Sequence, residues 1–168
     1  ICRPWDAARD GLSIGEAAAF ALLERDAVAP AQGWMLGLGE SNDGYHMSTP
    51  HPEGAGAIAA MRAALADAGL APADIDYINL HGTATPSNDA AEDRAVASVF
   101  GTETPCSSTK GATGHTLGAA GGVEAAIALL AIRHGLMPGG LNTEHIDPAL
   151  CLNYLRANRT TPVRRVLS

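Results

Sequence analysis

The sequence predicts an α/β fold in which short strands alternate with helices. A helical pattern covers 54–69, a short apolar strand pattern covers 75–80, and small and apolar residues dominate 114–134. Glycine and alanine at that density favour a helix only where other backbones pack closely against it, so 114–134 predicts a central buried helix. Hydrophobic residues make up 46% of the 168 residues, which is enough to bury a core.

Local patterns give the order of the elements. In the first part of the chain we expect a loop over 1–16, a buried strand or short helix over 17–24, a connector over 25–33, a strand over 34–39 and a surface loop over 41–52. A helix over 54–69 should follow and end at Gly69, and after it a strand over 75–80. The last part should hold a helix capped by Asn88 or Asp89 and closed by Gly101, a strand over 104–108, the helix over 114–134, and a strand beginning within 162–167. The strand over 75–80 runs directly into the turn HGTAT, and the ends of strands are where α/β sheets usually place their chemistry.

The stretch 107–124 carries a lysine, a histidine and a glutamate. Lys110 lies in a turn rich in Ser, Thr and Gly, and His115 lies just before the predicted buried helix. The positive field of the helix N-terminus and the charge of Lys110 both disfavour imidazolium, which predicts a neutral His115. A neutral imidazole can donate a hydrogen bond to an oxygen that becomes negative during a reaction. A buried Lys110 needs a counter-charge, and Glu124 is the first acid after it.

Two histidines stand out because each lies in a turn flanked by glycine and other small residues. They are His81 in HGTAT and His115 in GHTLGAAG, whereas a structural role is the simpler interpretation of the other four, which are His46, His51, His134 and His145. Thr83 and Thr85 could hold an amide-bearing chain or only cap the turn, and the sequence favours neither. Lys110 could also be an ordinary solvated lysine.

Composition argues against several classes of function. The net charge of −7 disfavours nucleic acid and anionic membranes as general partners. No apolar run approaches the ~20 residues that span a bilayer, and the opening ICRPWD has neither Met nor the apolar core of a signal peptide. The 3 cysteines are widely spaced, which suits a reducing cytoplasm better than a disulfide framework. No cysteine or histidine spacing predicts a metal site, and no dinucleotide, phosphate-loop or serine-hydrolase motif is complete.

Four segments together resemble the β-ketoacyl-acyl carrier protein synthases, the condensing enzymes of the thiolase superfamily. They are CRPWDAARDGLSIGE, NDGYHMSTPHPEG, HGTAT followed by Asn88, Asp89 and Glu92, and SSTKGATGHTLGAAGGVEA. The resemblance implies the C-terminal half of a thiolase-like fold, with a mixed sheet, helices on both faces and one central buried helix. Residues 1–30 would be the end of the N-terminal half and a connector. Residues 31–168 would be the C-terminal half, stopping before the family's final glycine-rich strand motif.

The resemblance also implies a reaction, the decarboxylative Claisen condensation of acyl and malonyl thioesters in fatty acid or polyketide synthesis. His81 and His115 correspond to the histidines that stabilise the malonyl-derived enolate, and Lys110 to the lysine that orders the second of them. Thr83 and Thr85 correspond to the threonines that touch the phosphopantetheine arm. Supporting positions are Glu124, Asn79 and Asp43. No cofactor is implied beyond the carrier-bound pantetheine, although the glutamate matched by Glu124 helps some members form a structural monovalent cation site.

Partners follow from the same resemblance. They are acyl carrier protein, the N-terminal half of the same enzyme, and a second subunit in a cytoplasmic homodimer or heterodimer. The family's cysteine nucleophile lies in a DTACSS-like motif that this sequence lacks, so we expect the chain alone to be inactive. A non-catalytic partner subunit such as a chain-length factor, or a carrier-protein-binding module, is the alternative, although chain-length factors typically lack the intact histidine set. Ala84 and Ala17 depart from the family pattern, which has glycine or serine at the first position and glycine at the second.

Overall fold

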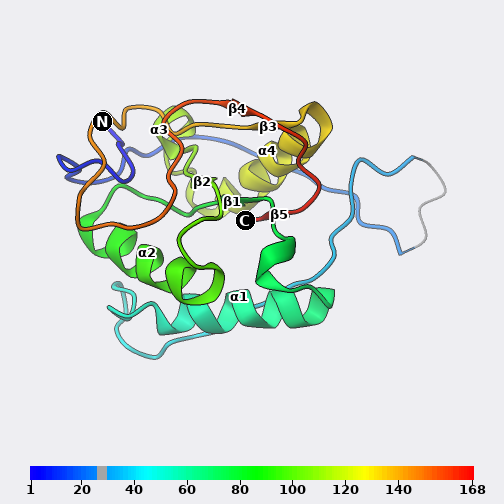
Figure 1. Cartoon of the computed structure of the whole chain (residues 1–168), viewed down its shortest axis with the longest axis horizontal. Helices are drawn as coiled ribbons and strands as arrows, with labels where there is room; N and C mark the ends of the chain where they lie inside the picture. The colour runs from blue at the N-terminus through cyan, green and yellow to red at the C-terminus, as the bar shows by residue number, and fades with distance from the viewer. Residues whose placement is uncertain (26–29) are drawn as a thin grey trace.

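The computed structural model describes residues 1–25 and 30–168, and it has the predicted α/β character (Figure 1). Part of the expected connector, 26–29, lies outside the described residues. In chain order the elements are α1 (Ala55–Ala68), the 3₁₀ helix η1 (Pro72–Asp74), β1 (Tyr77–Asn79), α2 (Pro86–Phe100), β2 (Cys106–Ser107), α3 (Lys110–Thr113), the 3₁₀ helix η2 (Leu117–Ala119), α4 (Ala120–His134), β3 (Leu136–Met137), β4 (Arg159–Thr160) and β5 (Val166–Leu167).

A parallel sheet in the order β2-β1-β5 separates two layers of helices. Successive residues of a strand point to opposite faces, and β1 shows this clearly. Ile78 packs with Leu65 of α1 and Val96 of α2, whereas Tyr77 belongs to the cluster that Ile132 of α4 covers. Helices therefore lie on both faces, as predicted. Antiparallel pairing occurs in a separate two-stranded ribbon, β3-β4, and at an isolated bridge between Asp6 and Ile146.

The two helices on the first face end as their sequences predict, but one begins earlier. Gly69 closes α1 in the left-handed conformation with φ 64°. Gly101 closes α2, but α2 begins at Pro86 with Thr85 as N-cap, not at Asn88 or Asp89. Proline suits the first turn of a helix because that turn does not use its missing N–H.

The side chain of Asp89 serves a different purpose from the predicted cap. It accepts hydrogen bonds from the backbone N–H groups of Trp5 and Ala84, at 3.1 and 3.2 Å. Asp6 in turn accepts the N–H groups of Glu144 and His145, at 2.7 and 2.9 Å. These buried carboxylates fasten the N-terminal loop to parts of the chain that are distant in sequence.

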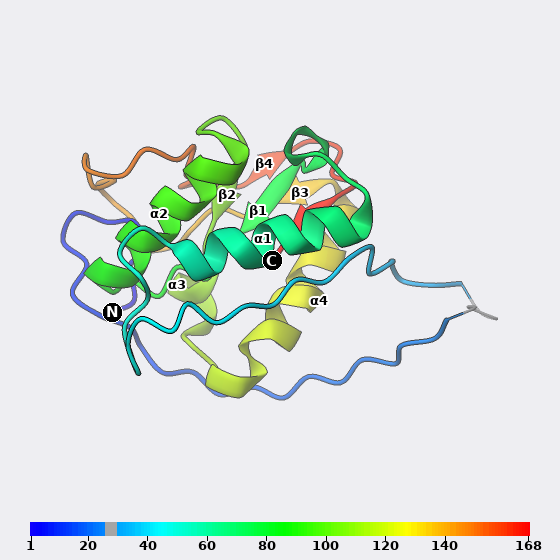
Figure 2. The ribbon, with the colours of Figure 1, turned by 90° about the horizontal axis from the view of Figure 1, so that it is seen from below.

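The buried strand or short helix predicted over 17–24 and the strand predicted over 34–39 are not present. Both segments are extended and irregular, and almost all their residues are exposed. A strand needs a neighbour for its backbone hydrogen bonds, and the described residues offer these segments none. The second segment instead runs alongside α1, where Leu38 N–H binds Asp67 and the Ser41 hydroxyl binds the carbonyl of Gly56 (Figure 2).

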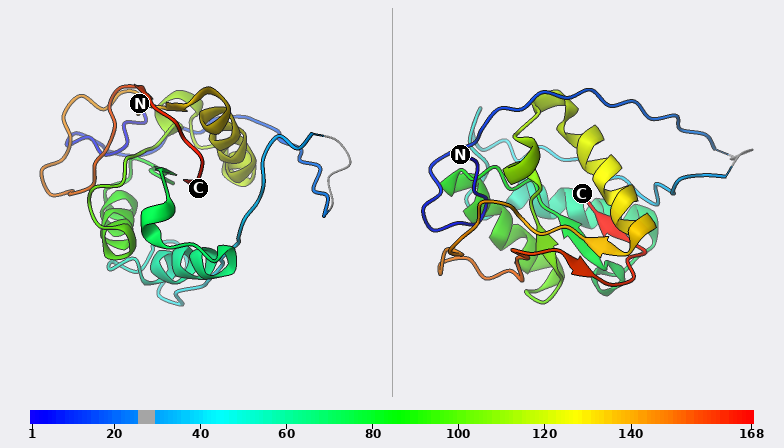
Figure 3. Two further views of the ribbon diagram at one scale, coloured as in Figure 1. Left: turned by 45° about the vertical axis from the view of Figure 1, so that its right-hand side comes forward. Right: turned by 90° about the horizontal axis from the view of Figure 1, so that it is seen from above.

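The predicted buried helix over 114–134 is shorter and more exposed than expected. Its regular part, α4, begins at Ala120, because the chain turns at Gly114 (φ 67°) and Leu117 (φ 51°) before it. Only Ala120 and Ala131 of α4 are buried, and one side of the helix faces away from the sheet (Figure 3). Ala19 and Gly33 approach α4 at Gly122 and Leu129, but most of its small-residue face is exposed in the described part of the chain.

Among residues 1–25 and 30–168, one segment, Leu117–His134, is long and apolar enough to cross a membrane by length and composition, with a mean hydropathy of 1.3. This finding differs from the expectation that no apolar run approaches the length of a membrane span. A single helix of this kind is weak evidence for a membrane span, because a core helix of a protein without any membrane segment can have the same length and composition. Glu124, which lies within it, is paired with a lysine inside the structure.

The cap at Gly69 gives a simple test of the fold. A Cβ on Gly69 would meet no atom within 4 Å, so substitution acts only through its left-handed backbone. Gly69→Ala should lower the free energy of unfolding by about 1 kcal/mol. Gly69→Asn should lose less, because asparagine tolerates this conformation better. Chemical denaturation of both variants is the measurement, and equal stability of wild type and Gly69→Ala would contradict the cap.

Candidate active site

The turn HGTAT lies between β1 and α2, beside the end of β2. Gly82 has φ 40°, and a Cβ there would collide with the Ser108 side chain, so only glycine fits. The Ser108 hydroxyl donates to the Gly82 carbonyl at 2.8 Å and accepts the backbone N–H of Lys110 at 3.2 Å. Because β1 and β2 are parallel, their carboxyl ends bring His81 and Lys110 together.

His81, Lys110, His115 and Glu124 form one cluster. The rings of His81 and His115 meet edge to face, with centroids 5.1 Å apart and an interplanar angle of 87°. Lys110 is 1% exposed and forms the predicted ion pair with Glu124. Its Nζ lies 3.4 Å from Nδ1 of His81. The predicted ordering of His115 by Lys110 stays a prediction: the charge of Lys110 acts on His115, whereas the closest described contact of its ammonium with a histidine is to His81.

Both imidazoles are held neutral. Surrounding protein desolvates the His81 ring, and the Lys110 ammonium and His115 add to this, so the pKa of His81 falls to about 4 although the residue is exposed. Desolvation, followed by Lys110, also lowers the pKa of His115, while Glu124 opposes the shift. The predicted neutral His115 is supported, with desolvation as the largest cause and the predicted effect of the Lys110 charge as the second.

The hydrogen bonds also favour one tautomer for each ring. Nδ1 of His115 accepts the backbone N–H of Leu117 at 3.2 Å, and Nδ1 of His81 faces the Lys110 ammonium. A nitrogen that accepts a hydrogen bond carries no proton, so each ring keeps its proton on Nε2. The cluster thus holds two neutral N–H donors close together.

The hydroxyls of Thr83 and Thr85 bind each other, with Oγ1 atoms 2.9 Å apart. Thr83 is buried, and its hydroxyl also accepts the N–H of Thr85 at 3.5 Å. Turn capping therefore occurs here, while an oxygen with two lone pairs can still bind a ligand. Asn79, at the end of β1, is 3% exposed, and neither polar atom of its side chain has a hydrogen-bond partner among the described residues.

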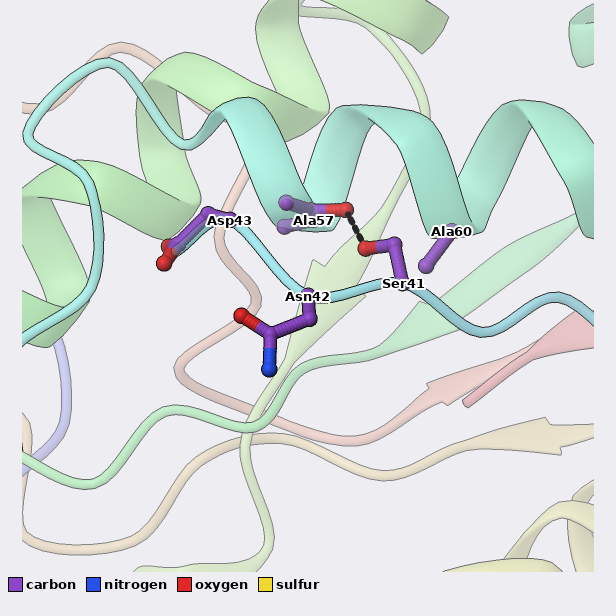
Figure 4. Close-up of a pocket in the computed structure, with 6 residues that line it drawn as sticks. Ser41, Asn42, Asp43, Ala57 and Ala60 are labelled. Atoms are coloured by element: carbon purple, nitrogen blue, oxygen red, sulfur yellow. Dashed lines mark hydrogen bonds between the residues drawn. The ribbon is translucent and has the colours of Figure 1, made fainter. Parts of the chain in front are cut away.

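Asp43 lies outside the cluster, in the surface loop before α1. Its carboxylate accepts the N–H groups of Tyr45 and His51, at 3.0 and 2.9 Å, and these bonds lower its pKa. It lines a cavity of about 390 Å³ against α1 (Figure 4). In that view the Ser41 hydroxyl points at the helix, whereas the Asn42 amide points away from it.

A second cavity, of about 260 Å³, connects this loop with the histidine cluster. It is lined by Asp43, Pro50, Gly54, Ala57, His81, Asn88, Ala91 and Glu92. Glu92 belongs to the segment that begins with HGTAT, but its position in the sequence alone indicates no role for it. Its carboxylate accepts the backbone N–H groups of His81 and Gly82, at 2.6 and 2.8 Å.

None of the 3 cysteines in the sequence has the environment of a nucleophile. Burial raises the pKa of Cys2, Cys106 and Cys151, so each stays a thiol at neutral pH. Across residues 1–25 and 30–168, no group of three or more His, Cys, Asp or Glu side chains could hold a metal ion.

Curated relatives match most of this chain but extend well beyond it. The 3-oxoacyl-[acyl-carrier-protein] synthase 2 of Coxiella burnetii is 44% identical over 91% of this chain and 39% of its own length. The mitochondrial 3-oxoacyl-[acyl-carrier-protein] synthase of Arabidopsis thaliana is 46% identical over 87% of this chain and 34% of its own length. The chain thus spans less than half the length of these relatives.

Solved structures show the same fold. A ketosynthase in complex with its chain length factor from Xenorhabdus doucetiae matches with a TM-score of 0.84 and 43% identity, over 98% of this chain and 41% of its own. The ishigamide ketosynthase/chain length factor matches with a TM-score of 0.90 and 31% identity, over 99% of this chain and 42% of its own. These thiolase-like neighbours confirm the predicted fold class.

The family model for the C-terminal domain of β-ketoacyl synthases matches residues 33–144. That range contains the HGTAT turn, both clustered histidines, Lys110 and Glu124. The match, the curated relatives and the structural neighbours agree, and the chain belongs to the β-ketoacyl synthase C-terminal domain family.

Proposed function

We propose that this chain provides the malonyl half of the active site in a β-ketoacyl-acyl carrier protein synthase. The observation that carries the proposal is the pair of neutral imidazoles whose rings lie 5.1 Å apart. Two preorganised N–H donors at one point suit an oxygen that becomes negative only during reaction. Desolvated surroundings strengthen such hydrogen bonds.

The reaction would proceed in two steps. The malonyl thioester loses its carboxylate as carbon dioxide, and the electron pair of the broken C–C bond moves to the thioester oxygen as an enolate. Nε2–H of His81 and Nε2–H of His115 donate to that oxygen. The enolate carbon then attacks a second acyl thioester, a new C–C bond forms, and the thiolate of that ester leaves.

The acyl thioester would be held by a cysteine outside this chain, in the N-terminal half of the same enzyme. The raised pKa values of Cys2, Cys106 and Cys151 support this assignment. We place the boundary between the halves near residue 30, and the exposed face of α4 is a surface on which the other half would pack.

Substrates would arrive on the phosphopantetheine arm of acyl carrier protein. Thr83 and Thr85 offer the arm hydroxyl groups beside His81, and Asp43 shapes the neighbouring loop. Glu124, whose second carboxylate oxygen does not bind Lys110, is the residue that would help to hold a monovalent cation, which prefers oxygen ligands. A cation there would neutralise part of the Glu124 charge.

A chain-length-factor-like partner subunit is the second candidate. Neighbours of known structure include ketosynthases bound to a chain length factor and to an acyl carrier protein, so heterodimers occur among them. The intact pair of histidines favours the catalytic subunit. In either case we propose a cytoplasmic protein that acts as a homodimer or heterodimer.

One experiment separates these functions. The complete protein, with its N-terminal half, is incubated with acyl and malonyl carrier proteins, and released carbon dioxide and condensed product are measured. A synthase gives both products, whereas a chain-length-factor-like subunit gives neither without its partner. Residues 1–168 alone should give no condensation, and clear condensation by this chain would show that it contains its own nucleophile.

A further inference from the structure

Glu92 reaches from α2 back to the start of the HGTAT turn. One carboxylate oxygen accepts the N–H of His81 at 2.6 Å, and the other accepts the N–H of Gly82 at 2.8 Å. Each oxygen has one donor, so the carboxylate fits its site only when both oxygens can accept. These peptide groups are the backbone of the residue that carries one of the two imidazoles.

The same turn is held from its other side. The Gly82 carbonyl accepts the Ser108 hydroxyl at 2.8 Å, and the Ser108 oxygen accepts the N–H of Lys110 at 3.2 Å. The Lys110 ammonium then lies 3.4 Å from Nδ1 of His81. Glu92 therefore begins a chain of contacts that passes through the backbone of the turn and returns to the His81 ring.

The surroundings of Glu92 make its charge state sensitive to pH. Burial raises its pKa to about 7, although the two N–H groups act in the opposite direction. The titratable and charged groups around it are Asp89 on α2, His81 in the turn, Lys110 on α3, Cys106 on β2 and Asp43 across the cavity. The pKa values of both histidines are lowered from 6.5, that of His81 to about 4, whereas the pKa of Glu92 is raised toward neutral pH.

We propose that Glu92 is a positioning residue for the decarboxylation step, and that its ionised carboxylate holds the His81 backbone where the imidazole can reach the enolate oxygen. The inference rests on the proposed function and deepens it. A protonated Glu92 has only one good acceptor oxygen, so one of the two N–H groups loses its partner and the turn shifts. Acid should thus weaken activity through Glu92 before His81 gains a proton.

The protonated form of Glu92 favours the stability of the fold, whereas the proposal assigns activity to the ionised form. Its pKa in the folded protein is raised above the ordinary value of 4.5, so folding favours the protonated form. That contribution is complete below pH 4.5 and is lost as the pH rises through about 7. Glu92→Gln, which resembles the protonated form, should therefore not lower the melting temperature at pH 8.

The test uses the complete synthase and the variant Glu92→Gln, with Glu103→Gln as a matched control on the exposed connection that follows α2. Glu92→Gln should lower malonyl decarboxylation by about 10²-fold, since small misplacements of catalytic groups cost that much. The acid limb near pH 7 should disappear from its pH profile. Glu103→Gln should match wild type. Wild-type activity and an unchanged acid limb in Glu92→Gln would overturn the proposal.

A second readout does not need activity. In wild type, the amide proton shifts of His81 and Gly82 should titrate together with a midpoint near 7, and Glu92→Gln should abolish both transitions. If these amides do not respond to pH, the proposed role of Glu92 is wrong even when the enzyme is active. If the amides titrate but neither wild type nor His81→Ala decarboxylates malonyl carrier protein, the proposed function fails and the geometry of Glu92 stands.

Discussion

Replacing His81 or His115 by alanine in the complete synthase should lower malonyl decarboxylation by about 10²–10³-fold, the usual cost of losing one donor to a developing oxyanion. The double variant should lose little more than either single variant. Both imidazoles lie at one point, with ring centroids 5.1 Å apart, and would donate to one oxygen, so the remaining donor cannot act well alone. A double-mutant cycle on decarboxylation is the measurement, and multiplicative losses would contradict a shared oxyanion site.

The tautomers supply a sharper control for the same prediction. Because each Nδ1 faces a donor, each ring would donate through Nε2. Glutamine places its amide nitrogen near the position of Nε2, whereas asparagine places it near Nδ1. Glutamine should therefore restore more activity than asparagine at either position, and the opposite ranking would reverse the tautomer assignment.

The lowered pKa of His81 predicts how the stability of the fold changes with pH. A histidine whose pKa falls to about 4 in the folded protein stabilises the fold fully above its ordinary value of 6.5. That stabilisation is lost as the pH falls from 6.5 to 4, where His81 gains its proton. An NMR titration of the ring in the intact enzyme should show the low midpoint.

Lys110→Ala should be the most destabilising change in the site. Lys110 is 1% exposed and pairs with Glu124, whose side chain is 13% exposed, so its removal leaves a largely buried carboxylate without its partner. Breaking such a pair costs about 3–5 kcal/mol. Thermal or chemical denaturation of the complete synthase is the measurement. The double variant Lys110→Met with Glu124→Gln removes both charges and should recover most of the stability.

The same substitution should separate the two half-reactions. Loss of the Lys110 ammonium also removes a charge 3.4 Å from His81, so the pKa of His81 should rise in Lys110→Ala. Malonyl decarboxylation should fall further than acyl loading onto the cysteine, because only the former uses the histidines. Equal losses in separate assays of loading and decarboxylation would remove Lys110 from the malonyl half of the site.

Sequence patterns were most informative where local chemistry decides the structure. Gly69 and Gly101 ended their helices as expected because a left-handed or unusual backbone favours glycine. The Lys110–Glu124 pair was also predictable, since a buried ammonium needs an acid and Glu124 is the first one after Lys110 in the sequence.

Elements that depend on tertiary partners were harder to predict. The segments 17–24 and 34–39 have strand-like composition, but a strand also needs a neighbour, which the described residues do not provide. β3 and β4 have only 2 residues each, which is too short to show the alternation of apolar and polar residues that predicts a strand. The contact of Lys110 with His81 depends on the register of β1 and β2. The hydrogen bonds from the N–H groups of His81 and Gly82 to the Glu92 carboxylate depend on the packing of α2. Neither contact can be predicted from the neighbouring sequence.

The order in which this chain folds follows from the pairing of its sheet. β1 and β2 are joined through α2, whereas β5 reaches β1 only after the whole intervening chain, as the bond from Arg165 N–H to Asp76 across 89 positions illustrates. Closing a longer loop costs more entropy before any contact is gained. The unit β1–α2–β2, which carries His81 and Glu92, should therefore form early. The N-terminal loop, whose Asp6 binds His145 across 139 positions, should dock late and exchange its amide protons first.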